Sequence, residues 1–230
     1  MLNELAHFSL NIAFGFAIFG TIIPLVGATM QRSSWMQLAP IFSTLQFLLV
    51  AFAFGALTLA FVGSDFSLQI VVVNSHTLKP MLYKIAGVWG NHEGSLLLWI
   101  LILTLFAACA AFFGKTLPQS LLARVLGVQS SITAAFLAFV LFTSNPFTRV
   151  EFPPFNGQGL NPLLQDPGLA FHPPFLYLGY VGLSITFSFA VAALLEGKVD
   201  AAWGRWVRPW TLAAWIFLTI GIGLGSWWAY

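Results

Sequence analysis

The chain has 230 residues, of which 59% are hydrophobic and 7% are charged, and its formal net charge is +2. Soluble domains carry roughly 25% charged residues, so this composition excludes an ordinary soluble domain and indicates an integral membrane protein. The small net charge gives no indication of nucleic-acid binding. The single cysteine, Cys109, excludes an intrachain disulfide and a cysteine-based metal site.

Long apolar stretches recur along the whole chain, and a membrane-spanning helix needs about 20 such residues. The sequence therefore predicts one all-α domain, a polytopic bundle of about six transmembrane helices. Ionisable residues inside a membrane mark ion paths and proton relays. Because the predicted spans contain no Asp, Glu, Lys or Arg, an ion pump is disfavoured. The spans are expected at residues 5–30, 39–62, 94–114, 125–143, 173–195 and 209–230.

Positive charge alternates between the loops that join these spans. The positive-inside rule places the more basic loops in the cytoplasm. The N-terminus and the two long loops, 63–93 and 144–172, then lie outside, where we expect the functional surface. The inner set of basic residues comprises Arg32, Lys115, Arg124, Lys198, Arg205 and Arg208, and the outer set comprises Lys79, Lys84 and Arg149.

The stretch NPLLQDPGLAFHPPFLYLGY, residues 161–180, contains a histidine before two prolines. Proline suits the first turn of a helix and disfavours the helical conformation in the residue before it. We therefore expect a span that begins at Pro173 and Pro174, with His172 at its mouth beside Phe171. An imidazole in such a place can serve as an axial ligand of haem iron. The alternative is an interfacial histidine that caps the helix.

A second motif, WGNHEGS, stands just before the third predicted span and contains Trp89, Asn91, His92 and Glu93. The run HEGSL lacks the second histidine of the metalloprotease zinc motif. Glu93 near a helix N-terminus is favoured by the helix dipole. The functional alternative is an outer contact to a cofactor or a partner.

Three further features remain open. Arg149 is suited to pair with a carboxylate, either Glu151 or a cofactor propionate, although a surface ion pair would also explain it. Trp228 fits either an interfacial aromatic belt or the start of an aromatic cofactor platform. Gly221 and Gly225 have the four-residue spacing that permits close helix packing.

Several long motifs together resemble the CcmF family of haem-handling membrane proteins, which is related to CcmC and CcsA. The resemblance covers most of the chain beyond Trp89. The motifs are WGNHEGSLLLW (89–99), FTSNPF (142–147), NPLLQDPGLAFHPPFLYLGYVG (161–182) and RPWTLAAWIFLTIGIGLGSWWAY (208–230).

The resemblance implies a multi-pass protein of the bacterial inner membrane with a periplasmic N-terminus. It implies a component of the cytochrome c maturation haem lyase, which takes haem (haem b before attachment) from the chaperone CcmE. With CcmH-type partners, the lyase attaches the haem to apocytochrome c. By its place in the HPP motif, His172 would be an axial ligand of the haem iron. Membrane lipid is a further expected partner.

Family members continue past the position of Tyr230 into a tryptophan-rich WWD segment, and their other haem-ligating histidines also lie beyond that position. We therefore expect this chain to be the N-terminal portion of such a protein, either as a truncated sequence or as one half of a split protein, and not to be catalytic alone. The alternative function is a transporter of haem or another apolar solute. A structural subunit without cofactor contact is a third possibility.

Overall fold

The structure is a computed structural model that describes the backbone of residues 1–230 and every side chain except that of residue 163. Helices account for nearly all of the regular structure in these residues. The longer ones are α1 (Leu2–Thr29), α3 (Leu38–Val62), α6 (His92–Phe113), α7 (Gln119–Thr143), α8 (Pro167–Tyr180), α9 (Leu183–Glu196) and α10 (Ala201–Trp228). The short ones are α2 (Ser33–Met36), α4 (Gln69–Asn74), α5 (Met81–Ala86) and the 3₁₀ turns η1 (Gly114–Thr116) and η2 (Pro162–Leu164).

Six helical segments of the described chain are long and apolar enough to cross a membrane. This confirms the expected all-α bundle of about six transmembrane helices. Three of the six are composite, because α2 continues into α3, α6 into η1 and α8 into α9. The segments are Leu2–Thr29, Ser33–Val62, His92–Thr116, Gln119–Thr143, Pro167–Glu196 and Ala201–Trp228.

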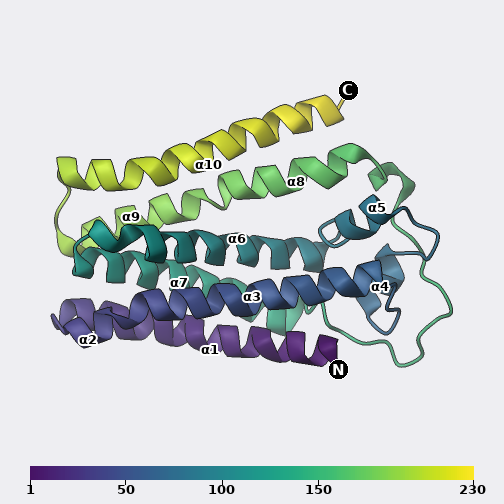
Figure 1. Ribbon diagram of the computed structural model, residues 1–230, viewed down its shortest axis with the longest axis horizontal. Coiled ribbons are helices and arrows are strands. Elements are labelled where there is room, and N and C mark those ends of the chain that lie inside the picture. The colour runs from purple at the N-terminus through teal and green to yellow at the C-terminus, as the bar shows by residue number, and fades with distance from the viewer.

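The long helices lie side by side, with α1 at one side of the bundle and α10 at the other (Figure 1). Both termini, α4, α5 and residues 144–166 gather at one end, here called the loop end. The opposite end, called the short-loop end, holds α2, η1 and the turn between α9 and α10. The two sets of basic residues are therefore separated between the two ends of the bundle.

Buried amide and hydroxyl groups connect α7 to its neighbours inside the bundle. From α3, Gln46 donates from Nε2 to Ser130 Oγ at 3.1 Å. From the adjacent position of α7, Gln129 donates from Nε2 to Ser184 Oγ at 2.7 Å, and its Oε1 accepts from Ser188 Oγ at 2.7 Å. In hydrocarbon, polar groups must find partners within the protein. These contacts therefore fix the register of α7 against α3 and α9.

The fifth span begins earlier than the sequence pattern predicted. We expected it to start at Pro173, but α8 starts at Pro167 and contains Pro173 and Pro174 in its interior. The expected start was wrong because a stronger signal lies upstream. Asp166 accepts a hydrogen bond from the Gly168 N–H at 2.7 Å, and Pro167 occupies the first turn.

The same span is divided into two helices at Val181 and Gly182. The piece nearer the loop end, α8, packs mainly on α10, whereas the piece nearer the short-loop end, α9, packs mainly on α7. At the division a side chain on Gly182 would collide with the Phe106 ring, 2.6 Å from its Cζ atom. The close approach of α6 therefore requires a glycine at this point.

Candidate functional site

His172 lies in the second turn of α8, inside the helix and not in a preceding loop. Its side chain is half-buried against α10, and Nδ1 lies 2.8 Å from the Gly221 carbonyl oxygen. A carbonyl oxygen can only accept, so Nδ1 carries the hydrogen of this bond. In the neutral imidazole, Nε2 therefore keeps its lone pair, which is the form that binds a metal.

Two residues of α10 shape the space around this imidazole. The Trp228 ring lies 5.9 Å from the His172 ring between centroids, at an angle of 48°. A Cβ atom on Gly225 would lie 2.6 Å from Cε1 and 3.0 Å from Nδ1 of His172. Gly221 is equally constrained, because its Cβ would lie 2.7 Å from Leu176 Cα. The glycine pair thus permits the close packing of α8 and α10 that the sequence predicted.

Pro173 removes a hydrogen bond from α8, and Trp89 replaces it. Proline has no backbone N–H, so Pro173 leaves the carbonyl of Leu169, four residues earlier, without its helical donor. The indole Nε1 of Trp89 donates to this carbonyl at 3.0 Å. Leu169 is only 5% exposed, so little water can reach the oxygen. Trp89 therefore anchors the helical turn that carries His172.

The other residues of the WGNHEGS motif organise the start of α6. Asn91 is the N-cap, accepting from the Gly94 N–H at 2.8 Å and donating to the Gly87 carbonyl at 2.7 Å. His92 is exposed, and its Nε2 lies 3.2 Å from Ser144 Oγ. Glu93 lines a cavity of about 260 Å³ whose wall also includes Asn74 and Ser144. These contacts account for Asn91 structurally and leave His92 and Glu93 accessible.

Arg149 lies away from His172, against the first helix. Its guanidinium forms an ion pair with Glu4 and not with Glu151, one of the two partners that the sequence suggested, and its Nη1 donates to Ser67 Oγ at 3.4 Å. Figure 1 places α1, which carries Glu4, on the opposite side of the bundle from α10. The structure therefore brings Trp228 against His172 and Trp89 against Leu169 of the same helix, but it does not bring Arg149 there.

Phe171, the residue before His172, is 51% exposed. In the described residues, no group of three or more His, Cys, Asp or Glu side chains could hold a metal ion. The imidazole, with Nε2 available and the Trp228 ring beside it, fits haem as an axial ligand.

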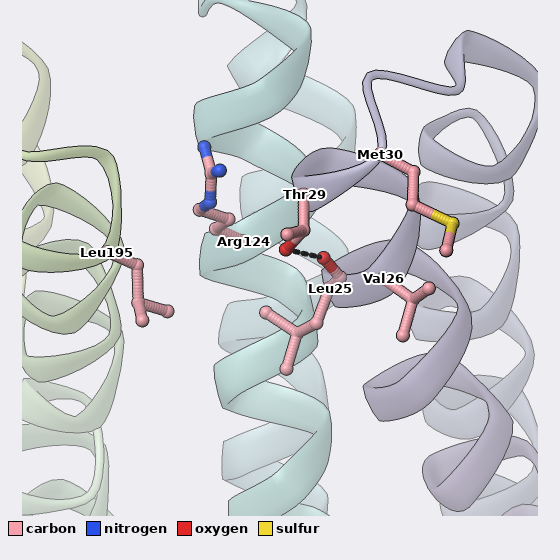
Figure 2. Close-up of a pocket in the computed structure, with 6 residues that line it drawn as sticks. All are labelled: Leu25, Val26, Thr29, Met30, Arg124 and Leu195. Atoms are coloured by element: carbon pink, nitrogen blue, oxygen red, sulfur yellow. Dashed lines mark hydrogen bonds between the residues drawn. The ribbon is translucent and has the colours of Figure 1, made fainter.

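A separate cavity of about 500 Å³ lies at the short-loop end, between the ends of α1 and α9 and the start of α7 (Figure 2). Its lining includes Leu25, Leu195 and Arg124. Arg124 pairs with Glu196 at 2.6 Å, and these two side chains are 12% and 13% exposed. The pair joins α7 to α9 far from His172, so this cavity is not part of the histidine site.

Sequence reasoning missed two features of the loop end. It did not predict the bond from Trp89 to the Leu169 carbonyl, although a proline inside a helix signals an acceptor in need of a donor. It also did not single out Lys79, which is buried beside a cavity of about 330 Å³. It stands between Leu78 and Pro80 in the loop, outside any apolar period, so no local pattern marks the burial.

Comparison with known proteins gives a consistent set of relatives. The family model for Cytochrome C assembly protein matches residues 89–230. The chain is 69% identical to the cytochrome c-type biogenesis protein ccl1 of Rhodobacter capsulatus and 48% identical to CcmF of Escherichia coli K12, over its whole length. It spans about a third of these relatives, 35% and 36% respectively.

A solved structure of the cytochrome c haem lyase CcmF superposes on the whole chain with a TM-score of 0.85 at 29% identity, and the chain covers 36% of it. The expected resemblance to the N-terminal portion of CcmF is therefore confirmed. Six spans, the histidine site and these matches together place the chain in the cytochrome C assembly protein family.

Proposed function

We propose that this chain forms part of a cytochrome c maturation haem lyase. It holds haem at the periplasmic face and helps its covalent attachment to apocytochrome c. The observation that carries the proposal is the contact between His172 Nδ1 and the Gly221 carbonyl at 2.8 Å. This contact leaves Nε2 as the ligand atom and fixes the ring plane, as second-shell bonds do for metal-ligating histidines.

The residues around His172 divide the work of holding and orienting haem b. Trp228 offers aromatic surface beside the imidazole, and Phe171, the preceding residue, presents an exposed ring. Pro173 and Pro174 limit the backbone freedom of the turn that carries the ligand. When bound, haem supplies the vinyl groups that react with the cysteine thiols. The role of the chain is to position these groups and not to transfer protons.

We further propose a periplasmic N-terminus and loop end in the bacterial inner membrane. The six basic residues at the short-loop end support this orientation under the positive-inside rule. The chaperone CcmE would deliver haem and a CcmH-type protein would present apocytochrome c at the loop end. The accessible His92 and Glu93 are proposed partner contacts. The WWD-containing remainder of the longer relatives would complete the haem platform.

Haem ligation is tested with full-length protein purified with its haem. His172→Ala is expected to lower haem content and to shift the Soret band, because the axial nitrogen is lost. Added imidazole is expected to restore the spectrum by filling the vacated position. His92→Ala is the matched control, since it removes an exposed histidine at the same end and should leave the spectrum unchanged. An unaltered spectrum in His172→Ala would exclude this ligand assignment.

Sidedness is tested by cysteine labelling in a full-length background without other cysteines. A membrane-impermeant thiol reagent applied from the periplasm should label Ser64→Cys at the loop end and spare Lys198→Cys at the short-loop end. The reverse pattern would overturn the orientation. Haem found at the short-loop end would favour the transporter alternative.

A further inference from the structure

Lys79 is a buried cation without a counter-charge. The residue is 7% exposed, and its Nζ donates to the Asn74 carbonyl at 3.0 Å. An ammonium group has three N–H donors. The ion pairs that the described residues form are Met1–Glu4, Arg149–Glu4 and Arg124–Glu196, and none of them includes Lys79.

The surroundings of Lys79 are unfavourable for its charge. Burial first, and then the positive charge of Lys84, lower the pKa of Lys79 from 10.5 to about 8. Lys84 itself donates to Ser64 Oγ at 2.9 Å. Buried charges in proteins are normally paired or bound to a ligand. A buried ammonium with one backbone partner is therefore a candidate for pairing with an anion from outside the chain.

The cavity beside Lys79 has the chemistry of an anion site. It measures about 330 Å³ and lies between the two long loops, with Lys79 and His76 from one loop and Gln158 and Gln165 from the other. His76 Nδ1 accepts from the Leu78 N–H at 3.1 Å. In the neutral ring, the hydrogen therefore sits on Nε2. An ammonium, an imidazole N–H and side-chain amides are all donors that a carboxylate accepts from.

This cavity adjoins the helix that carries the proposed haem ligand. Gln165 directly precedes Asp166, the N-cap of α8, and α5, which begins just after Lys79 and Pro80, packs against α8. From Pro167 to His172 the helix rises by about 8 Å. A porphyrin carries its propionates on flexible arms at one edge. The His172 ring itself packs against α10, so a propionate would have to extend from that side of α8 towards α5 to enter the cavity.

We propose that the cavity between the two long loops binds a propionate carboxylate of haem, with Lys79 as the paired cation. This rests on the proposed function, because it takes the haem to be held at His172. It assigns to Lys79 the propionate contact that the sequence offered as one alternative for Arg149, whose guanidinium pairs with Glu4. An ammonium–carboxylate hydrogen bond in a buried site is among the stronger polar contacts in proteins.

The test compares protohaem with its dimethyl ester, which lacks the two carboxylate charges, in titrations of full-length apoprotein. The wild type should bind protohaem about tenfold more tightly than the ester, the ratio expected for a charged hydrogen bond. Lys79→Met should weaken protohaem binding by a similar factor and leave ester binding unchanged. Lys84→Met is the matched control and should keep the discrimination.

Equal affinity of the wild type for protohaem and ester would overturn the proposal. So would a loss of ester binding in Lys79→Met equal to the loss of protohaem binding. If Lys79→Met fails to fold, the wild-type comparison of the two porphyrins still decides the matter. If Lys79→Met still prefers protohaem over the ester but captures less of a partner protein, Lys79 belongs to a protein interface and the proposal fails.

The outcome is separable from that of the proposed function. In Lys79→Met the Soret band of bound haem should remain that of the wild type, because the ligand histidine is untouched. If the haem spectrum changes in His172→Ala but the wild type binds protohaem and its ester equally well, the Lys79 site is rejected and the His172 ligand assignment stands. If the wild type binds protohaem more tightly than the ester but the haem spectrum is unchanged in His172→Ala, the ligand assignment is rejected and the anion site is retained.

Discussion

The bond between Trp89 and Leu169 gives a prediction that one residue change isolates. Trp89→Phe keeps an aromatic ring but removes the indole N–H that donates at 3.0 Å to the Leu169 carbonyl. Because Leu169 is 5% exposed, its oxygen is left in a site where water is scarce. An unsatisfied buried acceptor costs about 1–3 kcal/mol. We expect Trp89→Phe to lower the free energy of unfolding by an amount in this range.

The cause of this loss is tested by a double-mutant cycle with Pro173. Pro173→Ala restores a backbone N–H that can reach the Leu169 carbonyl within α8, so the indole becomes dispensable. Trp89→Phe should therefore cost clearly less in the Pro173→Ala background, with a coupling of about 1 kcal/mol or more between the two sites. Circular dichroism of the full-length protein in detergent, followed through denaturation, provides the measurement.

Trp215→Phe is the matched control for this cycle. Trp215 is 59% exposed on α10, so its replacement should change stability little. If Trp89→Phe is no more destabilising than Trp215→Phe, the bond to Leu169 does not stabilise α8. If its cost is the same with and without Pro173, the loss has a cause other than the missing helical donor.

Three further predictions concern the site and the ends of the bundle. Gly225→Ala should displace the neighbouring imidazole of His172 and lower haem affinity at least tenfold. Gly223→Ala should leave haem affinity unchanged, because its Cβ meets nothing within 4 Å. Haem titration measures both variants, and equal effects would contradict the steric reasoning. Arg124→Met should destabilise the protein by about 3–5 kcal/mol, because it leaves the carboxylate of Glu196 unpaired. Thermal unfolding measures this loss. An unchanged stability would show that the Arg124–Glu196 pair contributes little. Because the Lys79 pKa is lowered from 10.5 to about 8, the unfolded chain holds this proton more tightly, so thermal stability should rise as the pH increases from 8 towards 10.5. Lys79→Met should abolish that rise. Lys84→Met should keep most of it, because burial is the larger cause of the lowered Lys79 pKa and the Lys84 charge the smaller. A persistent rise in Lys79→Met would refute the assignment.

The spans were predictable because hydropathy alone marks them. About 20 apolar residues in a row have few alternatives to a membrane helix, and all six expected stretches overlap a helical segment of the structure. The boundaries were harder, because capping depends on local chemistry. The start of α8 was misjudged because the Asp166–Pro167 signal competes with the Pro173–Pro174 pair six residues later.

The surroundings of His172 were only partly predictable. The sequence singled out the histidine and the glycine spacing on α10, since both are local patterns. It did not indicate which residues would meet across the bundle. Contacts such as Trp89 with Leu169, or Arg149 with Glu4, join residues 80 and 145 positions apart. They follow from how helices pack, and no period in the sequence encodes that arrangement.

The division of the fifth span at Val181 and Gly182 has a mechanical consequence for the histidine site. Because α8 packs mainly on α10 and α9 mainly on α7, the imidazole is supported chiefly by α10 and not by the α1, α3, α6 and α7 core. We expect a small reorientation of the imidazole to be accommodated between α8 and α10 without repacking of that core.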